Sequence, residues 1–242
     1  MEGTQAGQLA LAIDQRPRTW GVTRQGAGRK RSGPRHDPPH RARPDHKPWQ
    51  PIHVVRRTRP DVPRLRRRKV YEAVRRALLV VAVRHAFRVV HLSIQRNHLH
   101  LLVEADDGRA LSRGMQGLDI SLARRINRAC RRTGKVFAHR FHATPITSPR
   151  QTRNALAYVL NNWRRHREDR AEGCTAALDR FSTAIVFDGW IEATRFAIPA
   201  DYTPLPVARA KSWLLCIGWR RHPAIDWRKV PGTRSGARGA SV

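Results

Sequence analysis

The chain of 242 residues is long enough for one hydrophobic core with appended segments. Its 48 lysines and arginines against 18 acidic residues give a formal net charge of +30, which a polyanion must neutralise. Nucleic acid is the polyanion that such a surface favours. No apolar run approaches the roughly 18 residues of a membrane-spanning helix, and the N-terminus lacks an apolar signal core. We therefore expect a cytoplasmic, nucleoid-associated protein without membrane contact.

The composition changes twice along the chain and predicts three parts. Within residues 1–48, the stretch 21–48 mixes Gly, Pro, Arg and His with almost no large apolar side chain, so it cannot bury enough surface to offset chain entropy. We expect a disordered basic arm there, serving either as a DNA-gripping tail or as a solvated linker. Residues 49–168 are predicted to form the folded domain. Residues 169–242 form a basic extension that we expect to pack partly on the core, and its role stays open.

Hydrophobic periodicity predicts the elements of the folded domain in chain order. Alternating and β-branched segments predict strands, and apolar residues at helical spacing predict helices. Ser148 and Pro149 are typical of the first turn of a helix. We expect strands at 52–58, 87–94, 98–104 and about 136–146, and helices at 65–85, 111–129 and from 149 onward. The order β-α-β-β-α-β followed by a helix predicts an α+β, ferredoxin-like fold with an antiparallel sheet.

The third predicted strand carries a pair of histidines, His98 and His100. Alternate side chains share one face of a strand, so both imidazoles point away from the core face, with Cα atoms about 7 Å apart. Two imidazoles placed in this way can converge on one divalent cation. The plain alternative is a pair of surface histidines, and the pair alone does not decide between them.

The helix that begins at Pro149 carries a tyrosine that its apolar stripe does not explain. The stripe consists of Leu156, Val159, Leu160 and Trp163. Tyr158 projects from the opposite side of the helix, together with Asn154, Asn161, Asn162 and Arg165. Tyr158 and Asn162 are four residues apart and stack on one face. A phenol can attack a phosphodiester, and the Asn162 amide could complete a two-histidine, one-amide site suited to Mg²⁺ or Mn²⁺.

Four segments together resemble the REP-associated tyrosine transposases, which belong to the single-tyrosine HUH nucleases. They are NHLHLLVE (97–104), LSRGMQGL (111–118), GKVFAHRFH (134–142) and ALAYVLNNWRRH (155–166), and the resemblance runs from about residue 53 to 166. It implies metal-dependent cleavage and rejoining of single-stranded or hairpin DNA from palindromic repeats, through a 5′-phosphotyrosine. It assigns Tyr158 as nucleophile and His98, His100 and Asn162 as ligands of Mg²⁺ or Mn²⁺. NNWRRH and His139 depart from the family pattern, which leaves the substrate preference open.

Further basic residues are predicted to contact DNA. Arg140 and His142 alternate with Phe141 before the last helix, which suits a single-strand path or, equally, a solvated edge strand. The polar faces of two helices add more candidates: Arg113, Arg124, Arg128 and Arg165.

Two other functions remain open. The first is a non-catalytic, domesticated DNA- or RNA-binding protein on the same fold. The second is a replication initiator or relaxase, although no phosphate-binding GxxxxGK[ST] loop is present. We expect a monomer or homodimer without an obligate protein partner.

Overall fold

The computed structural model describes residues 45–170, 177–192, 196 and 198–232. The predicted arm therefore lies almost wholly outside the described residues, as do the last ten residues. Its final residues, 45–48, are described, and His46 Nε2 lies 3.2 Å from the carbonyl oxygen of Ala105. The main elements are β1 (Ile52–Arg57), α1 (Arg68–Ala82), β2 (Phe87–Ile94), β3 (His98–Ala105), α2 (Gly108–Ala129), β4 (His142–Pro145), α3 (Pro149–Arg165) and α4 (Trp213–Cys216).

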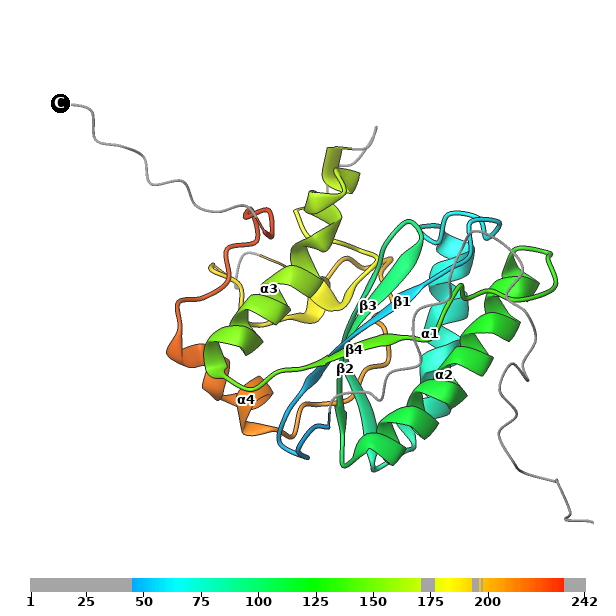
Figure 1. Cartoon of the computed structure of the whole chain (residues 1–242). Coiled ribbons are helices and arrows are strands. Elements are labelled where there is room, and N and C mark those ends of the chain that lie inside the picture. The colour runs from blue at the N-terminus through cyan, green and yellow to red at the C-terminus, as the bar shows by residue number, and fades with distance from the viewer. Residues whose placement is uncertain (1–44, 171–176, 193–195, 197, 233–242) are drawn as a thin grey trace, which may run out of the picture. The chain divides into compact units, whose positions relative to one another are not determined.

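The four strands form an antiparallel sheet in the order β2-β3-β1-β4, as a ferredoxin-like fold requires (Figure 1). The predicted fold is thus confirmed. Helices α1 and α2 pack on one face of the sheet, where Leu99, Leu101 and Val103 of β3 enter the main core. The other face of β3 turns towards α3. The period-2 alternation of β3 therefore directs its histidines to the α3 side.

Two predicted elements differ in extent from those observed. Helix α1 begins at Arg68 and not near Leu65, and the Leu65 amide ties the preceding segment to the carbonyl of Arg96. The predicted strand at 136–146 is interrupted: residues around Phe137 pair with the end of β1, and β4 itself is short. Between the two, Phe141 turns into the core and the Arg56 guanidinium donates to the carbonyl of His139.

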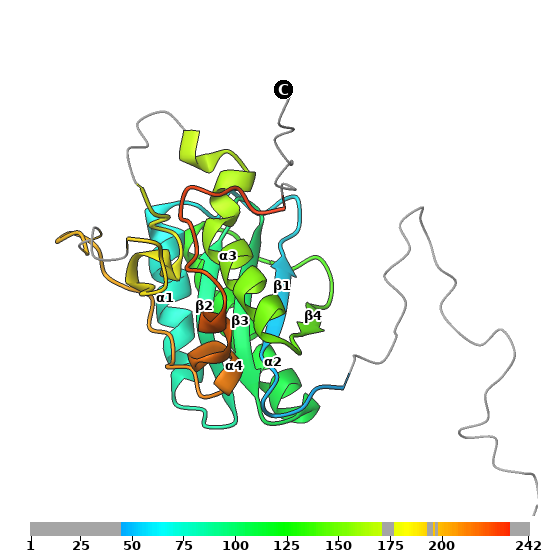
Figure 2. The same cartoon turned by 90° about the vertical axis from the view of Figure 1, so that its left-hand side faces the viewer.

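The C-terminal extension shares a second apolar cluster with α3. Figure 2 shows its orange and red segments running beside that helix. The cluster joins side chains of the sheet, of α3 and of the extension. Its members include Leu102 from the sheet, Leu156 and Leu160 from α3, and Phe187, Trp190 and Trp219 from the extension. The fully buried Glu104 carboxylate holds the extension at residues 211 and 212, because it accepts hydrogen bonds from the backbone amides of Lys211 and Ser212. It also accepts a hydrogen bond from Arg88. One part of the described extension is thus built onto the α3 face of the sheet, whereas Tyr202 and Leu205 join the main core.

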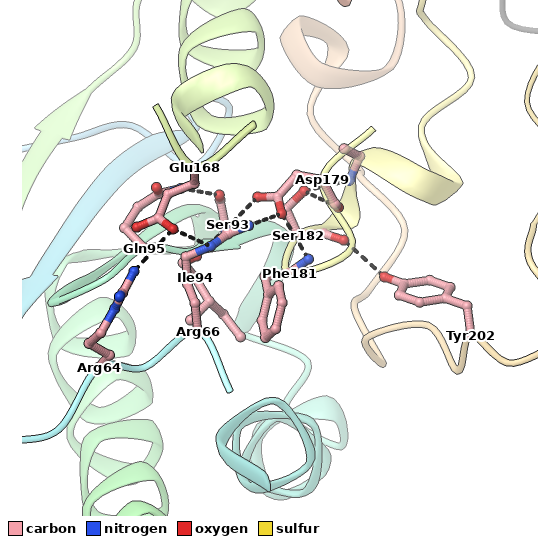
Figure 3. Close-up of polar contacts among 11 residues, drawn as sticks. Arg64, Arg66, Ser93, Ile94, Gln95, Glu168, Asp179, Phe181, Ser182 and Tyr202 are labelled. Atoms are coloured by element: carbon pink, nitrogen blue, oxygen red, sulfur yellow. Dashed lines mark hydrogen bonds and ion pairs between the residues drawn. The ribbon is translucent and has the colours of Figure 1, made fainter. Parts of the chain in front are cut away.

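A buried ion pair fastens the start of the extension (Figure 3). Arg66 donates to both carboxylate oxygens of Asp179, at 2.8 and 3.0 Å, and to the carbonyl of Ile94 at the end of β2. Glu168, just after α3, lies 3.4 Å from Arg64 and 3.7 Å from Arg66. Asp179 is fully buried, so loss of Arg66 would strand a charge in the interior. This network joins α3, the extension and the end of β2.

Candidate active site

The two histidines of β3 form the centre of a buried polar cluster beneath α3. The Nε2 atoms of His98 and His100 lie 2.9 Å apart, and both side chains are buried. His98 Nδ1 donates to the Asn97 side-chain oxygen at 2.8 Å. This bond places the proton of a neutral His98 on Nδ1 and leaves the Nε2 lone pair directed towards His100.

His53 of β1 is a third histidine of the cluster, and the sequence patterns considered above did not point to it. Its ring stacks on that of His100 with centroids 5.2 Å apart, and its Nε2 lies 3.1 Å from His100 Nδ1. The alternation of side chains along β1 could have indicated this position. Ile52 and Val54 enter the core, so His53 projects from the other face. Pairing of His53 with Leu102 then places it beside His100.

Arg57 projects from the same face of β1 as His53, and the sequence patterns considered above did not point to it either. It is the register partner of His98, it is exposed, and it has no hydrogen-bond or ion-pair partner among the described residues. Its neighbour Arg56 differs, because it is buried and donates to Asp119 at 3.0 Å. The site therefore has one arginine at its edge that is available to a phosphate.

All three clustered histidines have lowered pKa values. Burial, the main cause, and neighbouring histidines lower the pKa of His53 and His98 to about 4 and that of His100 to about 2. The imidazoles are therefore neutral at physiological pH. Neutral imidazole is the form that binds a metal ion.

Helix α3 places three side chains over this cluster. The Tyr158 ring packs edge-on against His100 and His53, with centroids 5.2 and 5.7 Å away, and the His166 ring lies 5.3 Å from that of His98. Asn162 is one helical turn from each, so it lies between Tyr158 and His166, above the histidine pair. It is fully buried, and within the described ranges neither polar atom of its side-chain amide has a hydrogen-bond partner.

The predicted polar side of α3 is more covered than its sequence suggested. Tyr158 is half-buried, and Asn154 and Arg165 are exposed, but Asn161 and Asn162 are buried. Asn161 donates to the carbonyl of Asp226 in the extension at 2.9 Å. Part of this polar side is therefore buried, because a segment distant in sequence covers Asn161.

The cluster fits a hard divalent cation by its donor set. Two nitrogen ligands at about 2.1 Å and 90° would be about 3 Å apart, which matches the separation of the His98 and His100 Nε2 atoms. The unpartnered amide of Asn162 could supply an oxygen. Within the described ranges, no group of three or more His, Cys, Asp or Glu side chains is arranged to hold a metal ion. A ligand set here would thus depend on an amide as its third member.

The predicted DNA-contacting residues fall into separate regions. Arg113, Arg124 and Arg128 are exposed on α2, across the sheet from Tyr158. Arg124 and Arg128 line a groove of about 330 Å³ that also contacts Val80 of α1. The remaining candidates are exposed around β4 and at the end of α3: Arg140, His142 and Arg165. No helix in the described part of the chain is long and apolar enough to cross a membrane.

The fold and this cluster together define an α+β domain in which a histidine pair on the sheet faces a tyrosine on a covering helix. Residues 50–162 match the model of the family described as IS200-like transposases. The predicted transposase resemblance is thereby confirmed, and a transposase-like role in DNA processing follows.

A solved structure agrees with the fold. A REP-associated tyrosine transposase bound to a REP hairpin matches with a TM-score of 0.50 and 16% identity, over 72% of this chain and 98% of that one. A candidate transposase from Deinococcus radiodurans matches with a TM-score of 0.34 and 17% identity, over 40% of this chain and 78% of that one. None of the curated proteins matches the sequence.

Proposed function

We propose that the protein cleaves and rejoins single-stranded or hairpin DNA through a covalent bond to Tyr158, with a divalent cation held by His98, His100 and Asn162. The observation that carries the proposal is the edge-on contact between the Tyr158 ring and His100. This contact supports a nucleophile placed next to candidate cation ligands. The non-catalytic alternative gives no reason to keep a tyrosine, two neutral imidazoles and an unpartnered amide in one buried cluster.

The covalent step exchanges one phosphodiester for another. The Tyr158 phenolic oxygen attacks the phosphorus, its proton is released, and the bond from phosphorus to the 3′ oxygen breaks. The 3′ oxygen takes up a proton, which leaves a free 3′-hydroxyl and a 5′-phosphotyrosine. A 3′-hydroxyl that attacks the phosphotyrosine reverses these changes, so the retained ester bond makes rejoining possible without an external energy source.

The surrounding side chains prepare the site for this step. Asn97 accepts the Nδ1 proton of His98, and His53 Nε2 is placed to accept that of His100, so both Nε2 atoms are left free as ligands. Mg²⁺ or Mn²⁺, when bound, would draw charge from the phosphate and make its phosphorus more electrophilic. Arg57, exposed beside His98, would bind a non-bridging phosphate oxygen and orient the ester.

Hairpin DNA is the proposed substrate because of the fold match to a protein solved with a REP hairpin. The exposed basic residues of α2 and around β4 would hold the phosphates of that DNA: Arg113, Arg124, Arg128, Arg140, His142 and Arg165. Such contacts supply affinity with little sequence preference.

Two end labels test the proposal. The protein is incubated with Mn²⁺ and a hairpin oligonucleotide that has a single-stranded flank, labelled at either the 5′ or the 3′ end. A denaturing gel should show the 3′ label bound to protein and the 5′ label released on a shorter strand. Tight hairpin binding without any adduct would support the non-catalytic alternative. A protein-bound 5′ label would overturn the proposed polarity.

A further inference from the structure

Gln95, the residue that follows β2, is fully buried but only half satisfied in its hydrogen bonding. Its Nε2 donates to the Ser93 hydroxyl at 2.7 Å, whereas its Oε1 is buried without a partner among the described residues. If the amide were turned over, its oxygen would contact Ser93 and its nitrogen would be the atom without a partner. Ser93 is the side-chain partner of this amide in the described part of the chain. A buried amide end without a partner is costly unless something absent from the chain satisfies it.

Strand pairing places this amide beside the histidine pair. The Gln95 amide nitrogen donates to the His98 carbonyl at 2.9 Å, and Ser93 is the register partner of His100. Residues directly opposite in an antiparallel pair share a face, with Cβ atoms about 5 Å apart. Ile94 and Leu99 enter the core on the other side, which leaves Gln95 and His98 on the α3 side.

Gln95 and Asn162 therefore flank the same two imidazoles from different elements. Both side chains are fully buried, and both have amide atoms without partners. Gln95 lies next to His98 within the sheet, and Asn162 lies above the pair on α3. The backbone next to Gln95 is also held in place. Arg66 donates to the carbonyl of Ile94, and the same guanidinium is paired with Asp179 (Figure 3).

We infer that Gln95 is a further residue of the cation site, with its Oε1 directed to the ion or to an ion-bound water. This inference rests on the proposed function, since it adds a donor to the cation site proposed there. An amide oxygen matches the preference of Mg²⁺ and Mn²⁺ for hard ligands. The Ser93 hydroxyl, by accepting from Nε2, orients Oε1 away from itself. Gln95 is thus a specificity residue that favours a hard cation over zinc.

The test is a titration of the DNA-free protein with Mn²⁺, followed by the electron paramagnetic resonance signal of the free ion. Gln95→Met keeps the buried volume but removes the oxygen, and it should weaken Mn²⁺ binding about tenfold or more. Gln95→Glu keeps the oxygen and adds charge, so it should bind Mn²⁺ at least as tightly as the wild type. His98→Ala serves as the control that removes a principal ligand. Circular dichroism establishes that each variant is folded.

The outcomes separate this inference from the proposed function. Equal Mn²⁺ affinity of the wild type and Gln95→Met, with loss of binding in His98→Ala, would overturn the role of Gln95 and leave the cation site in place. Weakened binding in both Gln95 variants would overturn the oxygen assignment, because an N–H donor would then be the group required. A wild type that binds no Mn²⁺ would overturn both the inference and the metal dependence of the proposed function.

Discussion

His98 and His100 bring their Nε2 atoms to within 2.9 Å of each other on the face of β3 that α3 covers. Lone pairs directed at one another over this distance require a proton or a cation between them. The hydrogen bond from His98 Nδ1 to Asn97 leaves the Nε2 of His98 free, and His53 Nε2 lies 3.1 Å from His100 Nδ1, where it can accept the proton of that ring. We propose that a cation shared by the two imidazoles occupies this position when the site is loaded.

Removal of either imidazole should separate binding from cleavage. His98→Ala or His100→Ala is expected to lower adduct formation by about 100-fold or more, because the cation loses a principal ligand. Hairpin affinity should persist, since exposed arginines supply the phosphate contacts. Gel shifts and adduct gels measure the two effects, and His85→Ala, at an exposed position, is the matched control. Wild-type cleavage by the double variant in a chelating buffer would contradict the metal role.

Acidification should destabilise the metal-free protein through its buried histidines. An unfolded histidine takes up a proton near its ordinary pKa of 6.5, whereas folded His53, His98 and His100 stay neutral down to about pH 4 or below. The unfolded chain thus binds more protons between these limits, so the free energy of unfolding falls as pH decreases from 6.5 towards 4. We expect a loss of about 1 kcal/mol or more per histidine at pH 5 relative to pH 7.

Denaturant titrations with chelator at pH 7 and pH 5 measure this loss. His100→Gln, which removes the most strongly shifted group, should reduce the difference between the two pH values. An identical pH dependence in the variant and the wild type would show that these histidines do not control acid stability.

Arg57 should contribute to the reaction more than to DNA binding. Arg57→Gln removes the exposed guanidinium beside His98, and a charged hydrogen bond to phosphate contributes about 1.5–3 kcal/mol. The cleavage rate at saturating hairpin should fall about 10- to 100-fold. Arg220→Gln loses the same charge from an arginine paired with Asp188, and its rate should stay at the wild-type level. Equal rates for both variants would remove Arg57 from the site.

The α2 arginines should act in the opposite way. Arg124→Ala with Arg128→Ala is expected to weaken binding to all hairpin sequences alike, since phosphate contacts carry no sequence information. The dependence of log affinity on log salt should decrease by about 0.7–0.9 for each phosphate that the variant no longer binds. Cleavage at saturating DNA should not change, because α2 lies across the sheet from Tyr158. An unchanged salt dependence would show that this groove does not contact DNA.

Local patterns in the sequence predicted most elements of the folded domain and three residues of the candidate site, His98, His100 and Tyr158. Period-2 alternation placed His98 and His100 on one face, and the helical stripe set Tyr158 apart from the core. These inferences need only the geometry of a single strand or helix. Both faces are now seen to meet between β3 and α3.

Further residues of the site depend on contacts between distant segments. His53 and Arg57 join the site only through the register of β1 against β3, which no local pattern specifies. Asn161 is buried because Asp226 of the extension covers it, and the described extension consists of short turns without a clear period. The sequence alone predicts that Gln95 lies in a turn, and only the pairing of the hairpin places it opposite His98.

The most direct test of the account is Tyr158→Phe, one of three possible tyrosine variants in this chain. The change removes one oxygen from a half-buried ring, so folding and hairpin binding should remain near wild type. Tyr202→Phe is the matched control: it loses a buried hydrogen bond to the Ser182 carbonyl, which costs about 1 kcal/mol, but should still form the adduct. On a denaturing gel with labelled hairpin and Mn²⁺, the account predicts an adduct for the wild type and Tyr202→Phe and none for Tyr158→Phe. An adduct that survives in Tyr158→Phe would contradict it.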